Sequence, residues 1–289
     1  MKQKLISVVI TSNKNNLNIS KTLDSLIDHH ITEIEYLVNL DGYDDANQNH
    51  LQAKYPMVKF TTFHGTISET VNKLIRLASG DYLARADDDD IYINRRLFLQ
   101  KQYLDFFTDI DVVGADIYID HQTGLYSYHR YLSDHDHLLV SATLGENWVL
   151  GHGTAMLRRR FFEKLAYAPI TDYLVEDFHL WVQGFCNGYR FANINIPLMI
   201  YTAPNYSAEK QGRMKESVIR SSVHLLETYF KVPSDVALLF VSYARSESLH
   251  SEETVNAMSA RRIVRAAFER SGIGRNSLES VSRRTGFRF

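Results

Sequence analysis

Residues 79–91 read SGDYLARADDDDI, and the interpretation of the whole chain starts from this stretch. Its first three residues are typical of a helix end and turn. Residues 82–86 form a short, mostly apolar strand that runs into four consecutive aspartates. Alternate residues of an extended segment point the same way, so Asp87 and Asp89 can face one pocket. Adjacent carboxylates repel one another unless a positive charge neutralises them, and their oxygens suit Mg²⁺ or Mn²⁺. The stretch therefore predicts a cation site; the alternative is a solvated acidic turn that caps the following helix.

Strand-like and helix-like segments alternate over the first 120 residues. Strands are expected at residues 5–10, 35–40, 57–63, 82–86 and 111–115, and helices at 18–31 and, capped by Ser68, at 68–77. This alternation predicts an α/β fold with a mostly parallel, doubly wound sheet. Ligands of such sheets bind beyond the carboxyl ends of the strands. Three strand ends carry polar groups, namely Thr11 to Asn13, Asp41, and Asp87 to Asp90. Their convergence predicts a ligand site.

Composition and charge narrow the classes of function. The chain has 45% apolar and 23% charged residues, as an ordinary globular protein does. Cys186 is its one cysteine, which excludes an internal disulfide and suits a reducing, cytoplasmic setting. No apolar run approaches the ~20 residues that span a bilayer. Residues 1–120 carry 18 Asp and Glu against 12 Lys and Arg, which argues against a nucleic-acid cleft there and suits a cation.

The end of the chain differs from the beginning in both pattern and charge. Residues 208–289 give only helical signals and carry 14 Lys and Arg against 9 Asp and Glu. We therefore expect a catalytic domain over residues 1–207, followed by a basic helical region. On a helix, Ile263, Val264 and Ala267 share one face, opposite arginines. This pattern fits peripheral contact with the anionic inner face of a membrane; the alternative is the solvated face of a packed helix.

Residues 79–91 resemble a segment of glycosyltransferase family 2, which reads small-Gly-acid-aromatic-apolar-Ala-Arg-x-Asp-x-Asp-Asp-Ile. Further matching pieces follow the family's order: Asp41-Gly42, Asn72, Arg95-Arg96-Leu97 with Gln100, GHGTAMLRR at residues 151–159, and EDFHLW at residues 176–181. The resemblance ends near residue 207. It implies a GT-A type, Rossmann-like fold and an inverting transferase of the hexosyl or a related class. Such an enzyme moves a sugar from a nucleotide-diphospho-sugar, expected to be a UDP-sugar, to an acceptor hydroxyl in polysaccharide or glycoconjugate synthesis.

The resemblance also assigns the donor side of the site. Asp41 with Asn13 or Thr11 would hold the base and ribose, and Asp89, with Asp87 as ribose or metal contact, would bind Mn²⁺ or Mg²⁺. The residues expected to bind the nucleotide sugar are Thr11, Ser12, Asn13, Asp41, Asn72, Arg85, Asp87 and Asp88. Residues 201–207 lack the histidine that the family places near the metal. The diphosphate and water would therefore complete the coordination of the ion.

The acceptor side rests on four residues. Inverting transfer needs a base that deprotonates the acceptor hydroxyl, and the resemblance assigns this role to Asp177, supported by Glu176. The same pair would also be stable as the acidic first turn of a helix. His152, between two glycines, either meets the acceptor or is structural. Trp181 either packs beneath the acceptor sugar or fills the core. The acceptor itself would be a saccharide or a lipid-linked molecule.

Two other functions compete with this interpretation. A nucleotidyltransferase also uses a parallel sheet and paired carboxylates, but it normally has a Gly-rich, basic phosphate loop after the first strand. The TSNK sequence of residues 11–14 is no such loop. A catalytically silent GT-A module could retain the fold for carbohydrate recognition alone. The paired acids Asp87 with Asp89 and Glu176 with Asp177 argue against that alternative.

Overall fold

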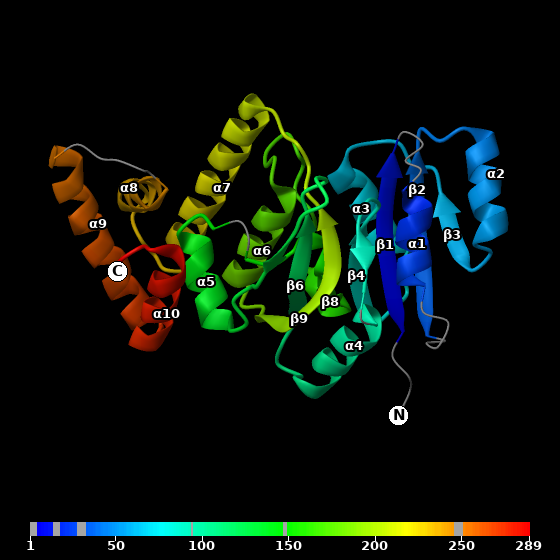
Figure 1. The fold of residues 1–289 in the computed structure, drawn as a ribbon. Coiled ribbons are helices and arrows are strands. Elements are labelled where there is room, and N and C mark those ends of the chain that lie inside the picture. Colours follow the sequence, from blue (N-terminus) through cyan, green and yellow to red (C-terminus); the bar gives the residue numbers. More distant parts are fainter. Residues whose placement is uncertain (1–4, 14–17, 28–32, 94, 147–148, 246–250) are drawn as a thin grey trace. The chain divides into compact units, whose positions relative to one another are not determined.

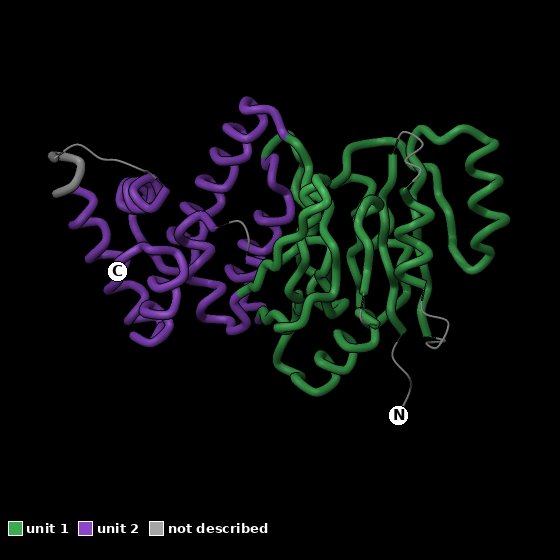
Figure 2. The backbone as a smooth tube through the Cα atoms, in the orientation of Figure 1, with its two compact units in different colours: residues 1–131, 150–172, 191–205 green, residues 132–149, 173–190, 206–289 purple. Residues whose placement is uncertain are grey.

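The computed structural model describes residues 5–13, 18–27, 33–93, 95–146, 149–245 and 251–289. The chain forms two compact units (Figure 2). Unit 1 comprises residues 1–131, 150–172 and 191–205, and unit 2 comprises residues 132–149, 173–190 and 206–289. The last crossing, after residue 205, lies close to the expected boundary at 207. Unit 2 also takes in two earlier segments, so it is more than a C-terminal extension.

The first half of unit 1 is the parallel sheet that the sequence predicts. Four strands lie in the order β3-β2-β1-β4, and all three pairings are parallel (Figure 1). They are β1 (Ile6–Asn13), β2 (Ile34–Asp41), β3 (Val58–Thr61) and β4 (Tyr82–Asp87). The helices that connect them are α1 (Ile19–Leu26), α2 (Asp45–Lys54) and α3 (Ile67–Leu77). The α/β fold with a doubly wound sheet is thereby confirmed.

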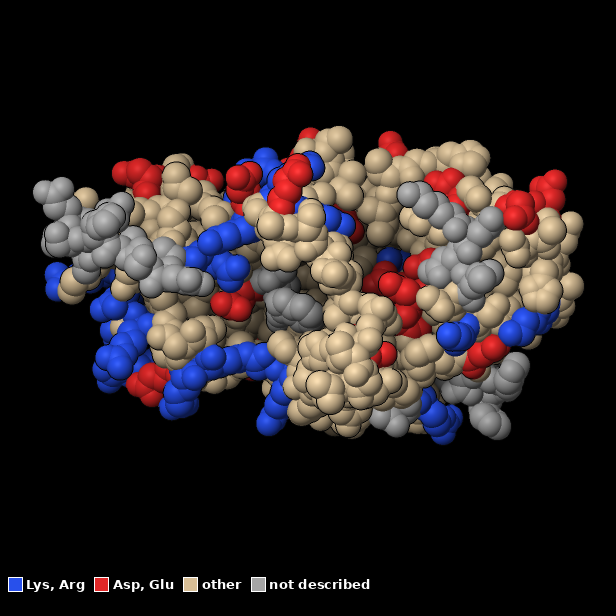
Figure 3. Space-filling model, turned by 45° about the horizontal axis from the view of Figure 1, so that its top comes forward, with Lys and Arg blue, Asp and Glu red and all other residues tan. Residues whose placement is uncertain are grey.

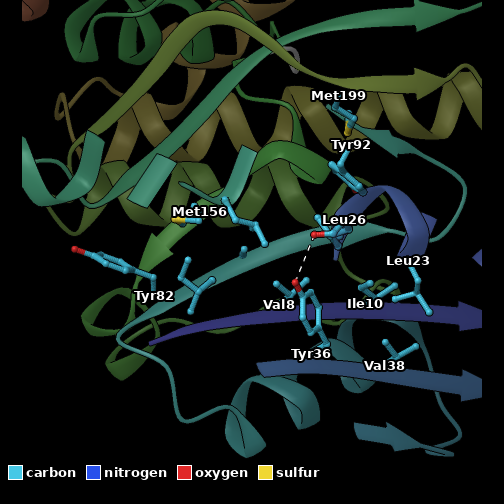
Figure 4. Close-up of a cluster of buried hydrophobic side chains, with 14 of the residues drawn as sticks. Val8, Ile10, Leu23, Leu26, Tyr36, Val38, Tyr82, Tyr92, Met156 and Met199 are labelled. Atoms are coloured by element: carbon cyan, nitrogen blue, oxygen red, sulfur yellow. Dashed lines mark hydrogen bonds between the residues drawn. The ribbon is translucent and has the colours of Figure 1, made fainter. Parts of the chain in front are cut away.

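Helices cover both faces of these strands. Val8, Ile10 and Val38 belong to one buried cluster with Leu23 and Leu26 of α1, and Figure 4 shows their side chains gathered there. Each leucine buried in this way contributes roughly 2 kcal/mol. The alternate residues of β1 and β2 point to the other face, where α3 packs on both strands. The carboxyl ends of the strands therefore stay uncovered at one edge.

The second half of the sheet is mixed, which the sequence did not indicate. From β4 the order continues β8-β6-β9-β5; β8 runs antiparallel to β4 and β6, whereas β9 runs parallel to β6. These strands are β5 (Ile91–Tyr92), β6 (Val112–Asp120), β8 (Met156–Arg158) and β9 (Phe191–Thr202), with β7 (Tyr126–His129) paired to β6. The helical segments of this half are α4 (Arg96–Phe106), η1 (His152–Thr154) and η2 (Arg159–Glu163). Strands β8 and β9 pair with strands that are distant in the sequence, so no local pattern predicts these pairings.

Two helix expectations need correction, and one helix was not expected. Helix α3 begins at Ile67 with Thr66 as its N-cap, because Thr66 and Glu69 form a capping box, so Ser68 is not the cap. Helix α2 was not expected from the sequence, because its residues show little amphipathic pattern. Helix α1 ends at Leu26. Residues 28–31 of the expected helix, and Lys14 of the loop after β1, lie outside the described residues.

Every regular element in the described residues of unit 2 is a helix, as expected for residues 208–289. Its helices are α5 (His135–Thr143), α6 (Glu176–Cys186), α7 (Ala208–Thr228), α8 (Ser234–Ala244), α9 (Ser251–Arg270) and α10 (Arg275–Thr285). Helix α6 packs on α7, α7 on α8, α8 on α9, and α10 on α5. In the part of the chain that is described, no helix combines the length and the apolar character needed to cross a membrane. Whether residues 1–207 act as a catalytic domain by themselves stays a prediction.

Candidate functional site

The ends of β1, β2 and β4 bring the expected polar residues together in unit 1. The register places Asn13 opposite Asp41 and Thr11 opposite Asp87. Ser12 contributes a cross-link, since its Oγ donates to a carboxylate oxygen of Asp88 and lies 2.7 Å from the hydroxyl of Tyr43. Figure 3 shows acidic side chains gathered around a hollow on the face that this edge of unit 1 presents. The strand ends therefore form one polar site, as the sequence predicts.

Arg85 and Tyr92 hold Asp87 in place. Arg85 Nη2 donates to Asp87 Oδ1 over 2.7 Å, and the side chain of Arg85 is only 2% exposed. The same guanidinium donates to the carbonyl oxygen of Val9 over 2.7 Å. The backbone N–H of Asp87 donates to the hydroxyl of Tyr92 over 2.8 Å. This geometry favours a positioning role for Arg85 over the expected direct contact with the donor.

His152 joins the same network. Arg85 Nε lies 3.2 Å from His152 Nε2, and the hydroxyl of Tyr167 lies 2.9 Å from it. A guanidinium can only donate, so Nε2 accepts and the proton of the neutral ring is on Nδ1. Nδ1 is 3.8 Å from Asp87 Oδ1. The imidazole thus faces the first aspartate of the motif, and the structural alternative for His152 has direct support; contact with an acceptor stays a prediction.

The side chain of Asn72 bonds to the backbone of Tyr167. Its Nδ2 donates to the carbonyl oxygen of Tyr167 over 2.9 Å, and its Oδ1 accepts from the backbone N–H of Tyr167 over 3.0 Å. Both halves of the amide therefore hold the backbone of Tyr167, the residue whose side-chain hydroxyl contacts His152. Asn72 was expected to bind the nucleotide sugar; the observed bonds give it a structural role, and a contact with the donor stays a prediction.

Asp89 and Asp90 lie in different environments. Asp89 is exposed, yet desolvation by the surrounding protein, followed by the charges of Asp87 and Asp88, raises its pKa to about 6. Asp90 is fully buried, and burial followed by the charge of Asp87 raises its pKa well above the usual range. Asp90 Oδ1 accepts from the backbone N–H of Thr202 over 2.9 Å, which ties the acidic turn to the end of β9.

Gly153 makes room for two of these carboxylates. A Cβ added at Gly153 would lie 2.9 Å from Asp87 Oδ2 and 3.1 Å from Asp90 Oδ2. Both distances are shorter than an ordinary van der Waals contact. The expected close backbone approach at this glycine is therefore observed, and the neighbours that require it are the acids of the motif.

The donor set fits a hard divalent cation with few protein ligands. Among the described residues, no group of three or more His, Cys, Asp or Glu side chains is placed to hold a metal ion. Asp87 is engaged by Arg85 and Asp88 by Ser12, so Asp89 is the carboxylate of the motif most open to an ion. Carboxylate oxygens suit Mg²⁺ and Mn²⁺, which commonly take their remaining ligands from substrate phosphates and water.

Unit 2 carries the expected acceptor-side acids. Glu176 and Asp177 occupy the first turn of α6, and Asp177 Oδ1 accepts from the backbone N–H of Phe178 over 2.8 Å. This turn is stabilised by the helix dipole, so the structural alternative for the pair is compatible with a catalytic one. Trp181 is 0% exposed. It fills the core of unit 2, which is the second of the two alternatives for this residue.

Further polar residues, most of which the sequence did not single out, contact the expected site residues. Tyr43, Tyr92 and Tyr167 contact Ser12, Asp87 and His152 respectively, and His64 pairs with Asp41. Arg96, below the site, donates to the carbonyl oxygens of Arg85 and Ala155. Tyrosines and histidines carry no local pattern that marks such a role. Only the matching of Arg96 to the family segment pointed to any of them.

The chain and its fold are similar to those of known sugar transferases. The O-antigen biosynthesis glycosyltransferase WbnJ of Escherichia coli is 23% identical over 217 residues, which cover 72% of this chain and 83% of WbnJ. The structure of residues 1–349 of S. aureus TarS with UDP covers 98% of this chain and 92% of that one, with a TM-score of 0.63 and 18% identity. The mannosyltransferase PcManGT from Pyrobaculum calidifontis, in complex with GDP-Man and Mn²⁺, covers 92% and 86%, with a TM-score of 0.52 and 13% identity.

The fold is that of the GT-A glycosyltransferases, which use a nucleotide sugar. Residues 7–166 match the family described as glycosyl transferase family 2, which is more than half of the chain. The chain belongs to this family. The resemblance inferred from residues 79–91 is confirmed.

Proposed function

We propose that the protein is an inverting, divalent-metal-dependent transferase that moves a hexosyl or related sugar from a UDP-sugar to a saccharide or lipid-linked acceptor. The observation that carries this proposal is the acidic surroundings of the Asp89 carboxylate. Its carboxylate stands beside two further acids, and its pKa is raised to about 6 by desolvation and by their charges. A cation bound there would relieve that repulsion.

The similar proteins support the finer parts of the proposal. WbnJ is named for O-antigen biosynthesis, which fits a saccharide or lipid-linked acceptor in polysaccharide synthesis. TarS has been solved with UDP and with UDP-GlcNAc, and PcManGT with GDP-Man and Mn²⁺. Both uracil and guanine nucleotides therefore occur on this fold. The fold by itself leaves the choice of base open, so the choice rests on the residues of the site.

In the proposed reaction the acceptor oxygen attacks the anomeric carbon as the bond from that carbon to the diphosphate breaks. Asp177 takes the proton of the acceptor hydroxyl, and Glu176 supports it from the same helical turn. The nucleoside diphosphate leaves, and a bound cation supplies charge neutralisation for it. Arg85 keeps Asp87 in place, so that the acids of the motif meet the donor in a fixed geometry.

The rival function is a silent carbohydrate-binding module; membership of the family argues against a nucleotidyltransferase. Melting temperatures measured with a panel of nucleotide sugars, in Mn²⁺ and in EDTA, would distinguish the transferase from the silent module. A ligand that binds only the folded state raises the melting temperature. We expect stabilisation by one nucleotide sugar that depends on Mn²⁺, together with release of the nucleoside diphosphate. Stabilisation by free saccharides alone, without turnover of any donor, would instead support the module.

We also propose that α9 and α10 contact an anionic membrane at the cytoplasmic face. Figure 3 shows Lys and Arg side chains gathered on the part of unit 2 that carries these helices. The exposed arginines there are Arg262, Arg270, Arg275, Arg283, Arg284 and Arg288. Val264 and Ala267 are buried, as in the alternative of a packed helix, whereas Ile263 is 43% exposed. The proposed contact therefore relies on the arginines and not on the whole apolar face.

The membrane proposal is tested best by charge reversal. Truncation would remove buried residues such as Phe268 and Leu278, and with them part of the core of unit 2. Changing Arg283, Arg284 and Arg288 to Glu retains the core. We expect the native protein to sediment with anionic liposomes at low salt and to be released as salt rises. The triple variant should stay in solution. Equal sedimentation of both proteins, or none of either, would contradict the proposal.

A further inference from the structure

An imidazole lies against the carboxylate at the end of β2. His64 Nδ1 is 2.6 Å from Asp41 Oδ1. The side chain of His64 is 80% exposed and that of Asp41 is 29% exposed, so the pair borders solvent at the polar edge of the sheet. Asp41 is the residue expected to meet the nucleotide base. His64 had no part in that expectation.

The fold determines where His64 lies. Asn39, fully buried in β2, accepts through Oδ1 from the backbone N–H of Phe63 over 2.6 Å, and its Nδ2 donates to the carbonyl oxygen of Phe63 over 2.9 Å. Asn39 Oδ1 also accepts from Thr61 Oγ1 over 2.9 Å. One buried amide therefore fixes the chain just before His64. On the other side, Lys73 Nζ donates to the carbonyl oxygen of His64 over 3.3 Å.

The pair leaves Asp41 with one oxygen that is not already engaged. An ionised carboxylate only accepts hydrogen bonds, so His64 Nδ1 carries the hydrogen and donates it to Oδ1. In the described part of the chain, no group donates a hydrogen bond to Asp41 Oδ2. An oxygen whose charge is already shared with an N–H group is the weaker acceptor for a second one. Asp41 is therefore suited to a base that presents one N–H group.

Uracil and guanine differ in this respect. Uracil presents a single N3–H between two carbonyl oxygens. Guanine presents N1–H and N2–H₂ side by side, and a carboxylate that binds both must offer both of its oxygens. A site that cannot satisfy a buried donor of its ligand discriminates strongly against that ligand, because the unpaired group has lost its hydrogen bond to water.

We propose that the Asp41–His64 pair selects a uracil nucleotide over a guanine nucleotide, with His64 as the residue that determines the specificity. The inference rests on the proposed function and on the expected contact of Asp41 with the base of the nucleotide. It adds the residue that chooses between the two bases found on this fold. Removing His64 frees Asp41 Oδ1 and so improves guanine binding in particular.

The test is calorimetric titration of UDP and GDP, in buffer with Mn²⁺, into the native protein and three variants. His64→Ala removes the donor, and His64→Gln retains an N–H group that can reach Oδ1. His50→Ala is the control, because His50 is an exposed histidine on α2. We expect the native protein and the His64→Gln and His50→Ala variants to prefer UDP by about tenfold or more. His64→Ala should lose most of this preference, mainly through tighter GDP binding.

The possible failures are distinct. If the native protein binds neither nucleotide, the proposed function itself is wrong and the inference falls with it. If UDP binds but His64→Ala leaves the ratio of the two dissociation constants unchanged, the proposed function stands and the role of His64 is overturned. Equal binding of UDP and GDP to the native protein also overturns it. A far-ultraviolet spectrum of each variant excludes loss of fold as the cause.

Discussion

Arg85 and Asp87 lie on the same face of β4, two residues apart, and the guanidinium donates to the carboxylate over 2.7 Å from an almost fully buried position. A buried guanidinium bonded to carbonyl oxygens cannot swing away, so it fixes the carboxylate that we expect to face the donor. We predict that Arg85→Lys, which retains the charge and loses the planar fork, weakens nucleotide-sugar binding at least tenfold. It should also cost about 1–3 kcal/mol of stability, since carbonyl acceptors are left unpaired. Titration with the donor and urea unfolding measure the two effects; unchanged donor affinity would contradict the positioning role.

Asp89→Asn tests the cation site. The change removes a charge that Asp87 and Asp88 repel, so we predict that the melting temperature of the metal-free protein rises. Mn²⁺-dependent binding of the nucleoside diphosphate should be lost at the same time. Glu216→Gln, at an exposed acid in the middle of α7, is the control and should change neither property. Affinity of the native protein for the nucleoside diphosphate that EDTA leaves unchanged would refute the role of Asp89.

Asp177→Asn tests the base. The amide retains the shape of the side chain and its bond to the N–H group of Phe178, but it cannot accept the proton of the acceptor. We predict that turnover falls by roughly 10²–10⁴-fold. The affinity for the nucleotide donor should hardly change. Steady-state kinetics and donor titration measure the two. Near-normal turnover in Asp177→Asn, with Glu176→Gln inactive, would reassign the role to Glu176.

Gly153→Ala tests the close packing beneath the acidic motif. The new methyl group would lie 2.9 Å from Asp87 Oδ2 and from Met199 Sδ. We predict a loss of about 1–3 kcal/mol in unfolding free energy, as for other overpacked sites, and weaker donor binding. Gly212→Ala is the matched control. Gly212 lies within α7 with open space around it, so this change should stabilise the protein by about 0.5–1 kcal/mol. Equal effects of the two changes would contradict the packing argument.

His179 predicts a pH dependence of stability. It is buried against α7, its ring stacks on Tyr173 with centroids 3.4 Å apart, and its Nδ1 lies 3.2 Å from Ser221 Oγ. Burial, followed by the charges of His224 and Arg220, lowers the pKa of His179 to about 4. Between this value and the ordinary pKa near 6.5, the unfolded chain binds the proton and the folded one does not. The contribution of His179 to the free energy of unfolding is therefore complete above pH 6.5. As the pH falls towards 4, about 3 kcal/mol of this contribution is lost.

Urea unfolding at several pH values between 4 and 7 measures this contribution, with His179→Asn as the comparison. The amide can retain the bond to Ser221 and does not titrate. The difference in unfolding free energy between the native protein and this variant should shrink as the pH falls, because only the native protein loses the contribution of His179. Carboxylates such as Asp89 titrate in both proteins, so their effect cancels in the difference. A difference that is constant with pH would show that His179 has an ordinary pKa in the folded protein.

The sequence by itself determined the parallel half of the sheet and the place of the acidic site. Strands β1, β2 and β4 are short, mostly apolar segments, and Asp41 and Asp87 stand at the ends of two of them. Local periodicity and the rule for strand ends therefore suffice to locate them. The helical character of residues 208–289 is likewise a property of neighbouring residues.

The tertiary structure alone decided what several of these residues do. Arg85 and Asn72 were expected to contact the donor, yet their bonds go to protein groups, and the partner of Asn72 is 95 positions away in the chain. The partner of Asp41, His64, is 23 positions away, and β8 and β9 reach the sheet by pairing with distant strands. No local pattern encodes such contacts, because each depends on how separate segments pack. The sequence therefore specified which residues stand at the strand ends, and the packing specified which of them remain open to a ligand.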